Sequence, residues 1–165
     1  MDRSEEDEFR AFVSVRMERW RRAAYLLCHD WHLADDLVGT VVGKLFERWR
    51  RVAATDNPDA YVQRVLTNAW IDERRRPWQR ESPADVVPDV VATPADATGD
   101  RDQLLRLLGR LGRRQRAVVV LRFYFDHSIE ETAEILGISA GTVKSQSARA
   151  LDLLRTLTQA SGRKP

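Results

Sequence analysis

Apolar residues recur every three or four positions through most of this chain, and no stretch shows the strict alternation that predicts a β-strand. In the first eighty residues this spacing predicts a helix over residues 4–28, capped by Ser4 with Asp7, and a second over 33–51. A third follows a polar loop, runs over 60–76 and ends at Pro77. The side chains predicted to point inward are Phe9, Phe12, Val13, Trp20, Ala24, Leu27, Leu37, Val38, Val41, Val42, Leu45, Phe46 and Trp49.

The helical pattern returns after residue 100, with helices predicted over 100–111 and 114–125. Their inward side chains are predicted to be Leu104, Leu105, Leu107, Leu108, Leu111, Val118, Val119, Leu121 and Phe125. Between the two helical regions, prolines, small residues and acids predominate, a composition that cannot bury enough apolar surface to offset chain ordering. The sequence therefore predicts an all-α protein with two small helical domains, 5–80 and 101–160, joined by an acidic flexible linker over 81–100.

A helix-turn-helix is predicted near the end of the chain. Ser128 and Glu131 have the spacing of a capping box, and Gly137 stands where a helix ends in a left-handed residue. After a short turn, Ser139 can cap a second helix, whose inward side chains are Val143, Ala150, Leu151 and Leu154. A second helix of this size can enter the major groove of DNA.

The outward stripe of that second helix is polar and carries no carboxylate before Asp152. Such a stripe suits base edges and phosphates, with glutamine matching adenine and arginine matching guanine. An ordinary helical hairpin with a solvated face is the alternative. The predicted duplex-binding residues are Thr142, Lys144, Ser145, Gln146 and Arg149.

Charge is divided unevenly along the chain. The formal net charge is +2, but residues 81–100 hold five acids and no base, while residues 101–165 hold twelve bases and six acids. A basic C-terminal region favours a polyanionic partner. The acidic N-terminus does not resemble a signal peptide, and no apolar run is long enough to span a membrane, so we expect a cytoplasmic protein without membrane insertion.

Enzymatic and metal chemistry find little support in the sequence. Cys28, His29 and His32 could suggest a metal site, but structural zinc prefers four ligands and no second cysteine exists. A buried thiol with polar histidines at a helix end is the simpler interpretation. Asp35 and Asp36 point about 100° apart on a helix, which does not suit two-metal catalysis. We expect no cofactor and no catalytic residue.

Three segments follow one another along the chain: Ala34–Asp35–Asp36–Leu37–Val38 with Phe46, the stretch from Asn57–Pro58 to the arginines at 74–76, and the helix-turn-helix from Ser128 to Ser145. Taken in this order, they resemble segments of an extracytoplasmic-function sigma factor of the sigma-70 family, of actinobacterial type. The first is similar to the segment that binds core RNA polymerase. The resemblance implies contacts with the clamp of the β′ subunit through Asp35, Asp36, Leu37, Val38 and Phe46. Gly39 and Thr40 stand where the family usually carries a Gln-Glu-like pair, and Gly43 is a second departure.

The second segment runs from Asn57-Pro58 to the arginines at 74–76 and is similar to the part of the family that opens and reads the −10 promoter element. Tyr61, Arg64 and Asn68 share a helical face and offer a stacking ring, a phosphate partner and an amide, as single-strand recognition requires. A solvated helix end is the alternative interpretation of the arginine run. The implied −10 residues are Asp56, Asn57, Tyr61, Arg64, Asn68, Arg74, Arg75 and Arg76.

The third segment, Ser128 to Ser145, is similar to the family's −35 reader. Together the segments imply a non-catalytic specificity subunit that binds core RNA polymerase, including the flap of the β subunit, and directs transcription initiation at promoter DNA. An anti-sigma factor is a further partner that the resemblance suggests. A stand-alone helix-turn-helix regulator, which binds duplex DNA without polymerase, remains the alternative function.

Overall fold

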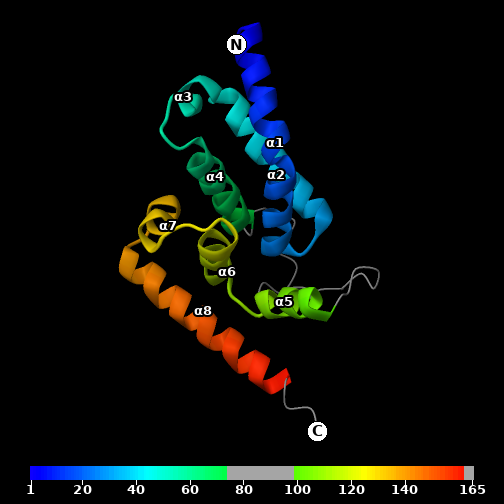
Figure 1. Ribbon diagram of the computed structural model, residues 1–165, viewed down its shortest axis with the longest axis vertical. Coiled ribbons are helices and arrows are strands. Elements are labelled where there is room, and N and C mark those ends of the chain that lie inside the picture. Colours follow the sequence, from blue (N-terminus) through cyan, green and yellow to red (C-terminus); the bar gives the residue numbers. More distant parts are fainter. Residues whose placement is uncertain (74–98, 162–165) are drawn as a thin grey trace. The chain divides into compact units, whose positions relative to one another are not determined.

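The computed structural model describes residues 1–73 and 99–161, and all regular structure within these ranges is helical (Figure 1). The prediction of an all-α fold is therefore confirmed. Contacts divide the chain into two compact units, Met1–Trp70 and Ile71–Pro165. Most of the predicted linker, residues 81–98, lies outside the described residues. None of the described helices is long and apolar enough to cross a membrane.

Helix α1 (Arg3–Cys28) begins with a capping box made by Asp2 and Glu5. The Asp2 side chain accepts a hydrogen bond from the Glu5 amide at 2.8 Å, and Glu5 Oε2 accepts one from the Asp2 amide at 2.8 Å. The predicted Ser4 cap is therefore wrong, because an equivalent acidic box two residues earlier satisfies the first free amides. The helix ends at His29, whose φ of 57° is left-handed.

The predicted helix over 33–51 is two helices, α2 (Trp31–Glu47) and α3 (Trp49–Ala53). The backbone departs from helical geometry at Arg48, whose ψ is 14°. This break lets Trp49 turn into the core, where its ring lies 5.6 Å from Phe9 and 5.2 Å from Phe12. Contrary to prediction, the Phe46 side chain does not point inward and is 49% exposed.

Helix α4 (Pro58–Asp72) is fixed at its start by two polar contacts. Asn57 Oδ1 accepts a hydrogen bond from the Ala60 amide at 3.1 Å, and the Asp59 carboxylate pairs with Arg16 of α1 at 2.8 Å. Farther along, Val62 and Leu66 are fully buried. Because the same turns bury one face and anchor the start, the opposite face of α4 is held in a defined orientation.

After α4, the next described helices of the second unit are α5 (Gly99–Gly109) and α6 (Arg113–Val119), and α6 continues into a short π-helical segment, Val120–Tyr124. The guanidinium of Arg116 is buried and donates to the Leu111 carbonyl at 3.1 Å, which satisfies an acceptor just after α5. Val118, Val119, Leu121 and Phe125 are buried as predicted. The prediction for Leu104 is wrong, since this side chain is 48% exposed.

The last two helices, α7 (Ile129–Leu136) and α8 (Ala140–Ser161), complete the second unit. Val118 of α6, Ala133 of α7 and Val143 of α8 form a shared core. Around it pack partly buried apolar side chains: Ile129, Leu136, Ile138 and Ala140. One residue from each of three helices therefore fixes the crossing of α7 and α8.

Two glycines in α2 generate a stability prediction. A methyl group added at Gly39 or Gly43 would meet no neighbouring atom within 4 Å, and both lie inside the helix. Gly39→Ala and Gly43→Ala should each raise the free energy of unfolding of the first unit by about 0.5–1 kcal/mol, because alanine has the better helix propensity. Urea unfolding followed by tryptophan fluorescence in a Trp78→Phe background measures this, since the other four tryptophans, Trp20, Trp31, Trp49 and Trp70, all lie in that unit.

Gly137→Ala is the matched control. Gly137 lies in the second unit and has a φ of +67°, where a β-carbon costs roughly 1–2 kcal/mol. It should leave the tryptophan transition unchanged while destabilising α7 and α8. A lower midpoint for Gly39→Ala would show that the outward face of α2 is not open.

Candidate nucleic-acid interface and partner-binding face

The outward face of α2 carries some, but not all, of the residues predicted to bind polymerase. With about 100° between successive residues, Asp36, Gly39 and Gly43 lie near the centre of that face. Asp35 and Phe46 lie along one edge, and both are exposed. Leu37 and Val38 instead lie in the core, at 4% and 5% exposure. The structure thus separates three surface residues from two that support the helix from within.

The two neighbouring aspartates of α2 have different surroundings. Asp35 accepts a hydrogen bond from Arg21 of α1 at 2.6 Å, and this contact raises the pKa of Arg21. The Arg21 guanidinium also lies 4.4 Å from the Trp31 ring, which stacks on Tyr25 at 4.0 Å. Asp36 has no ion-pair partner among the residues that the structure describes. Asp35 therefore helps to join α1 to α2, whereas the Asp36 carboxylate is available to a partner.

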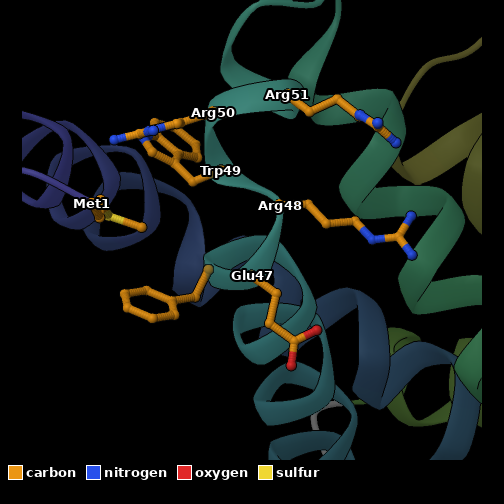
Figure 2. A pocket seen from close by; sticks show the side chains of 7 residues that line it. Met1, Glu47, Arg48, Trp49, Arg50 and Arg51 are labelled. Atoms are coloured by element: carbon orange, nitrogen blue, oxygen red, sulfur yellow. The ribbon is translucent and has the colours of Figure 1, made fainter.

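A cavity of about 560 Å³ opens where α2 meets α3 (Figure 2). It is lined by Met1, Phe46, Glu47, Arg48, Trp49, Arg50 and Arg51. Phe46 contacts Phe9 edge-on, with ring centroids 5.4 Å apart, and leaves about half of its own surface exposed. An exposed aromatic ring that is held in place by a buried one is suited to a protein contact.

The predicted −10 residues of α4 lie together on the face opposite its core. Asn57, Tyr61, Arg64 and Asn68 follow each other at intervals of three or four residues, and Val62 and Leu66 face the other way. Arg64 and Asn68 are exposed and Tyr61 is half-buried. The Asn57 oxygen already caps α4, while Asp56 is exposed in the preceding loop. Arg74, Arg75 and Arg76 lie outside the described residues.

The capping box that starts α7 is present and extends to a histidine. Ser128 Oγ accepts from the Glu131 amide at 3.0 Å, and Glu131 Oε1 accepts from the Ser128 amide at 3.4 Å. The second carboxylate oxygen of Glu131 lies 2.9 Å from His127 Nδ1, and Arg122 donates to the His127 carbonyl at 2.6 Å. The hydrogen bonds from His127 and then Ser128 lower the pKa of Glu131. Glu131 thereby ties the preceding loop to α7.

The turn between α7 and α8 also has the predicted geometry. Gly137 is left-handed, and the Ile138 amide donates to the Ala133 carbonyl at 3.0 Å. Ser139 Oγ accepts from the Thr142 amide at 3.1 Å and lies 2.8 Å from the Thr142 hydroxyl. These contacts fix the start of α8, so the direction of its side chains is set by backbone hydrogen bonds.

Lys144, Ser145 and Arg149 of α8 are exposed, as a surface that contacts DNA requires. Gln146 lies at the margin between this face and the core, and its Oε1 is buried with no hydrogen-bond partner in the described structure. The Thr142 hydroxyl is engaged by Ser139. For Gln146 to read a base, its side chain must turn outward, a movement that would also hydrate or pair its oxygen.

Two features of the site were not identified from the sequence. His127 anchors the helix-turn-helix through Glu131, although the sequence offered only their spacing of four residues. Arg48 and Arg51 are exposed at the α2–α3 junction, and the run of basic residues around Trp49 was a signal for them.

Cys28 donates to the Asp30 carbonyl at 3.2 Å. In the described part of the chain, no three His, Cys, Asp or Glu side chains are grouped to hold a metal ion.

Comparison with known proteins matches two family models in the order that the sequence motifs have. The model of sigma-70 region 2 matches residues 5–80, and that of sigma-70 region 4 matches residues 101–154. The first match begins inside α1 and includes α2 to α4, and the second begins inside α5, includes α6 and α7, and ends inside α8. A stand-alone helix-turn-helix regulator would not require the first, so this alternative is not favoured.

Curated relatives agree with the family models. The chain is 39% identical over 149 residues to the RNA polymerase sigma-E factor of Streptomyces avermitilis, a match that spans 90% of this chain and 83% of the relative. The sigma-E factor of Streptomyces coelicolor is 38% identical over 151 residues, with coverage of 90% and 84%. The ECF RNA polymerase sigma factor SigM of Mycobacterium tuberculosis is 37% identical over 94 residues, which are 55% of this chain and 46% of SigM.

Two solved structures share the fold. The sigma factor RpoE of Bartonella quintana, in complex with the anti-sigma factor NepR, gives a TM-score of 0.78 at 22% identity, covering 92% of this chain and 97% of that one. CnrH in complex with the cytosolic domain of CnrY gives 0.66 at 22% identity, covering 94% and 90%.

The lowered pKa of Glu131 generates a prediction of acid sensitivity. Its carboxylate is bound in the folded state, so it contributes stability above its ordinary pKa of 4.5, and this contribution is lost as pH falls through the lowered folded value. Glu131→Gln should therefore reduce the protection of α7 amides at pH 7, and the difference from wild type should close as pH falls below about 4.5. Hydrogen-exchange protection factors between pH 3 and 7 measure this, with Glu134→Gln as an exposed control. A difference that is independent of pH would contradict the assignment.

Proposed function

Given that this chain belongs to the sigma-70 family, as an extracytoplasmic-function sigma factor of actinobacterial type, we propose that α2, α4 and α8 divide its work between polymerase, the −10 element and the −35 element. The chain directs transcription initiation by RNA polymerase, as sigma factors do. Sigma factors are regulatory subunits, and we infer that this chain performs no chemistry itself. The cytoplasm, where polymerase acts, is its proposed location.

One observation carries the assignment of the surfaces. In each of the three helices most of the predicted contact residues lie on the face opposite the core, with Leu37, Val38 and Gln146 as the exceptions, and each helix start is fixed by a capping side chain. The groups on these faces also differ as the tasks do: acids and an exposed aromatic ring on α2, a half-buried aromatic ring with an amide and a guanidinium on α4, and hydroxyl and basic groups on α8. If one face made all the contacts, these different chemical groups would not need to lie on three separate helices.

The general test of the function is transcription in vitro with core polymerase over a promoter library. Synthesis that starts from promoters with two defined elements, and only when this chain and core polymerase are both present, is the expected result. Equal promoter binding by the chain alone would favour a stand-alone regulator instead.

The polymerase surface is proposed to consist of Asp35, Asp36 and Phe46, with Leu37 and Val38 supporting it from the core. We assign it to the clamp of the β′ subunit, and the second unit to the flap of the β subunit. At Gly39 and Gly43 this face of α2 has no side chain, so at these two positions a partner can approach the backbone closely. An anti-sigma factor is a further proposed partner, and the complexes solved for RpoE and CnrH support it.

Asp36→Arg should reduce co-purification with core polymerase at least tenfold, because it reverses an unpaired charge at the centre of the outward face. Helical content should remain unchanged, since no described contact of the Asp36 side chain is lost. Glu8→Arg on α1, an equal charge reversal at another exposed position, is the control and should bind normally. Wild-type binding by Asp36→Arg would remove this residue from the interface.

The −10 surface generates a prediction about strand opening. Asn68→Ala should slow open-complex formation while duplex binding remains close to wild type, because an exposed amide can pair with a base edge only once the strands have separated. The measurement is the fluorescence of a base analogue in the −10 element at equal promoter occupancy. Unchanged opening would place the single-strand site elsewhere than on α4.

The −35 surface generates a prediction that separates base reading from phosphate attraction. Gln146→Ala should relax the preference at one −35 base pair by roughly 1–3 kcal/mol, whereas Lys144→Ala should leave the preference intact and lower the salt slope by about one. A binding selection on randomised −35 DNA at two salt concentrations scores both variants. If Gln146→Ala selects the wild-type sequence, the amide stays in its buried position and Ser145 and Arg149 carry the readout.

A further inference from the structure

Three arginines surround Trp49 at the α2–α3 junction, and their partners differ. Arg50 donates to both carboxylate oxygens of Glu5, at 2.7 and 3.0 Å, and the pKa of Glu5 is lowered mainly by that contact. Arg48 and Arg51 are exposed, and among residues 1–73 and 99–161 neither has an ion-pair partner. One of the three charges is therefore neutralised within the fold, and two remain available to an external anion.

The side chains of the two free arginines extend to the same side of the α2–α3 junction. Trp49 and Val52 are the buried residues of α3, and Arg50 and Arg51 between them are exposed. Figure 2 shows Trp49 and Arg50 extending to the side of Met1, whereas Arg48 and Arg51 extend to the opposite side, where the ribbon of α4 lies. Arg48 directly precedes α3 and Arg51 lies inside it, so both side chains project from the stretch that leads out of α2.

The connection to α4 is short and internally bonded. Thr55 donates to the Val52 carbonyl through its amide at 3.0 Å and its hydroxyl at 2.6 Å, and Asn57 then caps α4. Arg51 thus lies a few residues before the polar loop that contains Asp56, and this loop leads directly into the outward face of α4. Among neighbouring acids, Asp59 is paired with Arg16, and Glu47 and Asp56 are the exposed carboxylates on either side.

We propose that Arg48 and Arg51 bind phosphates of the separated −10 strand, next to the part of that strand whose base is held by α4. This inference rests on the function proposed above and adds two positioning residues to it. Guanidinium groups bind phosphate oxygens through paired N–H donors without reading sequence. Arg64 lies on α4 and the two free arginines lie beyond the loop, so the strand has cations on both sides of the captured base. The pair therefore strengthens binding to the opened strand and leaves base preference to α4.

The test uses holoenzyme and forked promoter DNA in which one or the other strand is unpaired over the −10 element. Binding of wild-type holoenzyme identifies the preferred fork. On that fork, Arg48→Ala/Arg51→Ala should lower the slope of log affinity against log salt by about 1.4, or about 0.7 per phosphate contact on a single strand. The ratio of wild-type affinity to double-alanine affinity should therefore be roughly sevenfold smaller at 200 mM salt than at 50 mM salt. The preferred −10 sequence should stay the same.

Two control variants sharpen the outcome. Arg48→Lys/Arg51→Lys keeps both charges and should retain the wild-type slope, whereas Arg3→Ala/Arg10→Ala removes two exposed charges of α1 and should also retain it. An unchanged slope for the double-alanine variant would overturn the inference. So would a loss that arises in assembly with core polymerase, because the pair would then contact protein. If wild-type holoenzyme prefers neither fork, the proposed function itself fails.

Discussion

Burial of one apolar stripe per helix is the constraint on which every surface of this protein depends. In the first unit α1 packs against α2, and Trp20, Ala23, Ala24 and Leu27 of α1 are almost fully buried. Once α2 and α4 direct their apolar faces inward, the directions of their polar faces follow. The second unit obeys the same rule around Val118, Ala133 and Val143. The contact residues are therefore positioned by the core, although none of them except Leu37 and Val38 belongs to it.

Burial sets the direction of each helix face, and polar contacts at the helix starts fix it further. Amides at the start of a helix are satisfied by five sets of side chains: Asp2 with Glu5, Asp30, Asn57, Ser128 with Glu131, and Ser139. Such caps determine where a helix begins, and with it the residue that faces outward one or two turns later. In α8 the cap lies three residues before Thr142 and ten before Arg149, so a hydroxyl–amide bond orients a guanidinium a few turns away.

The sequence predicted the faces of the helices better than their interruptions. Periodicity identified the stripe of Asn57, Tyr61, Arg64 and Asn68, and the capping motifs around Ser128 and Ser139 were read directly. Periodicity could not reveal the break at Arg48, because Trp49 continues the apolar pattern of α2. The break follows from the packing of aromatic rings on α1. The π-helical turn at Val120–Tyr124 and the buried Gln146 oxygen likewise depend on tertiary neighbours. Phe46 and Leu104 were predicted to be inward for the same reason: periodicity does not show where a core ends.

The bonded turn between α3 and α4 has a consequence for insertions and deletions. From Trp49 to Asn57 the chain holds a buried indole at one end and a helix cap at the other, with Thr55 bonded to Val52 between them. One residue added inside α3 would rotate everything after it by about 100°, so that the indole and the cap could not both keep their places. Related chains should therefore vary in side chains over this stretch while keeping its length constant, and shuffling or loop-grafting should succeed only with pieces of equal length.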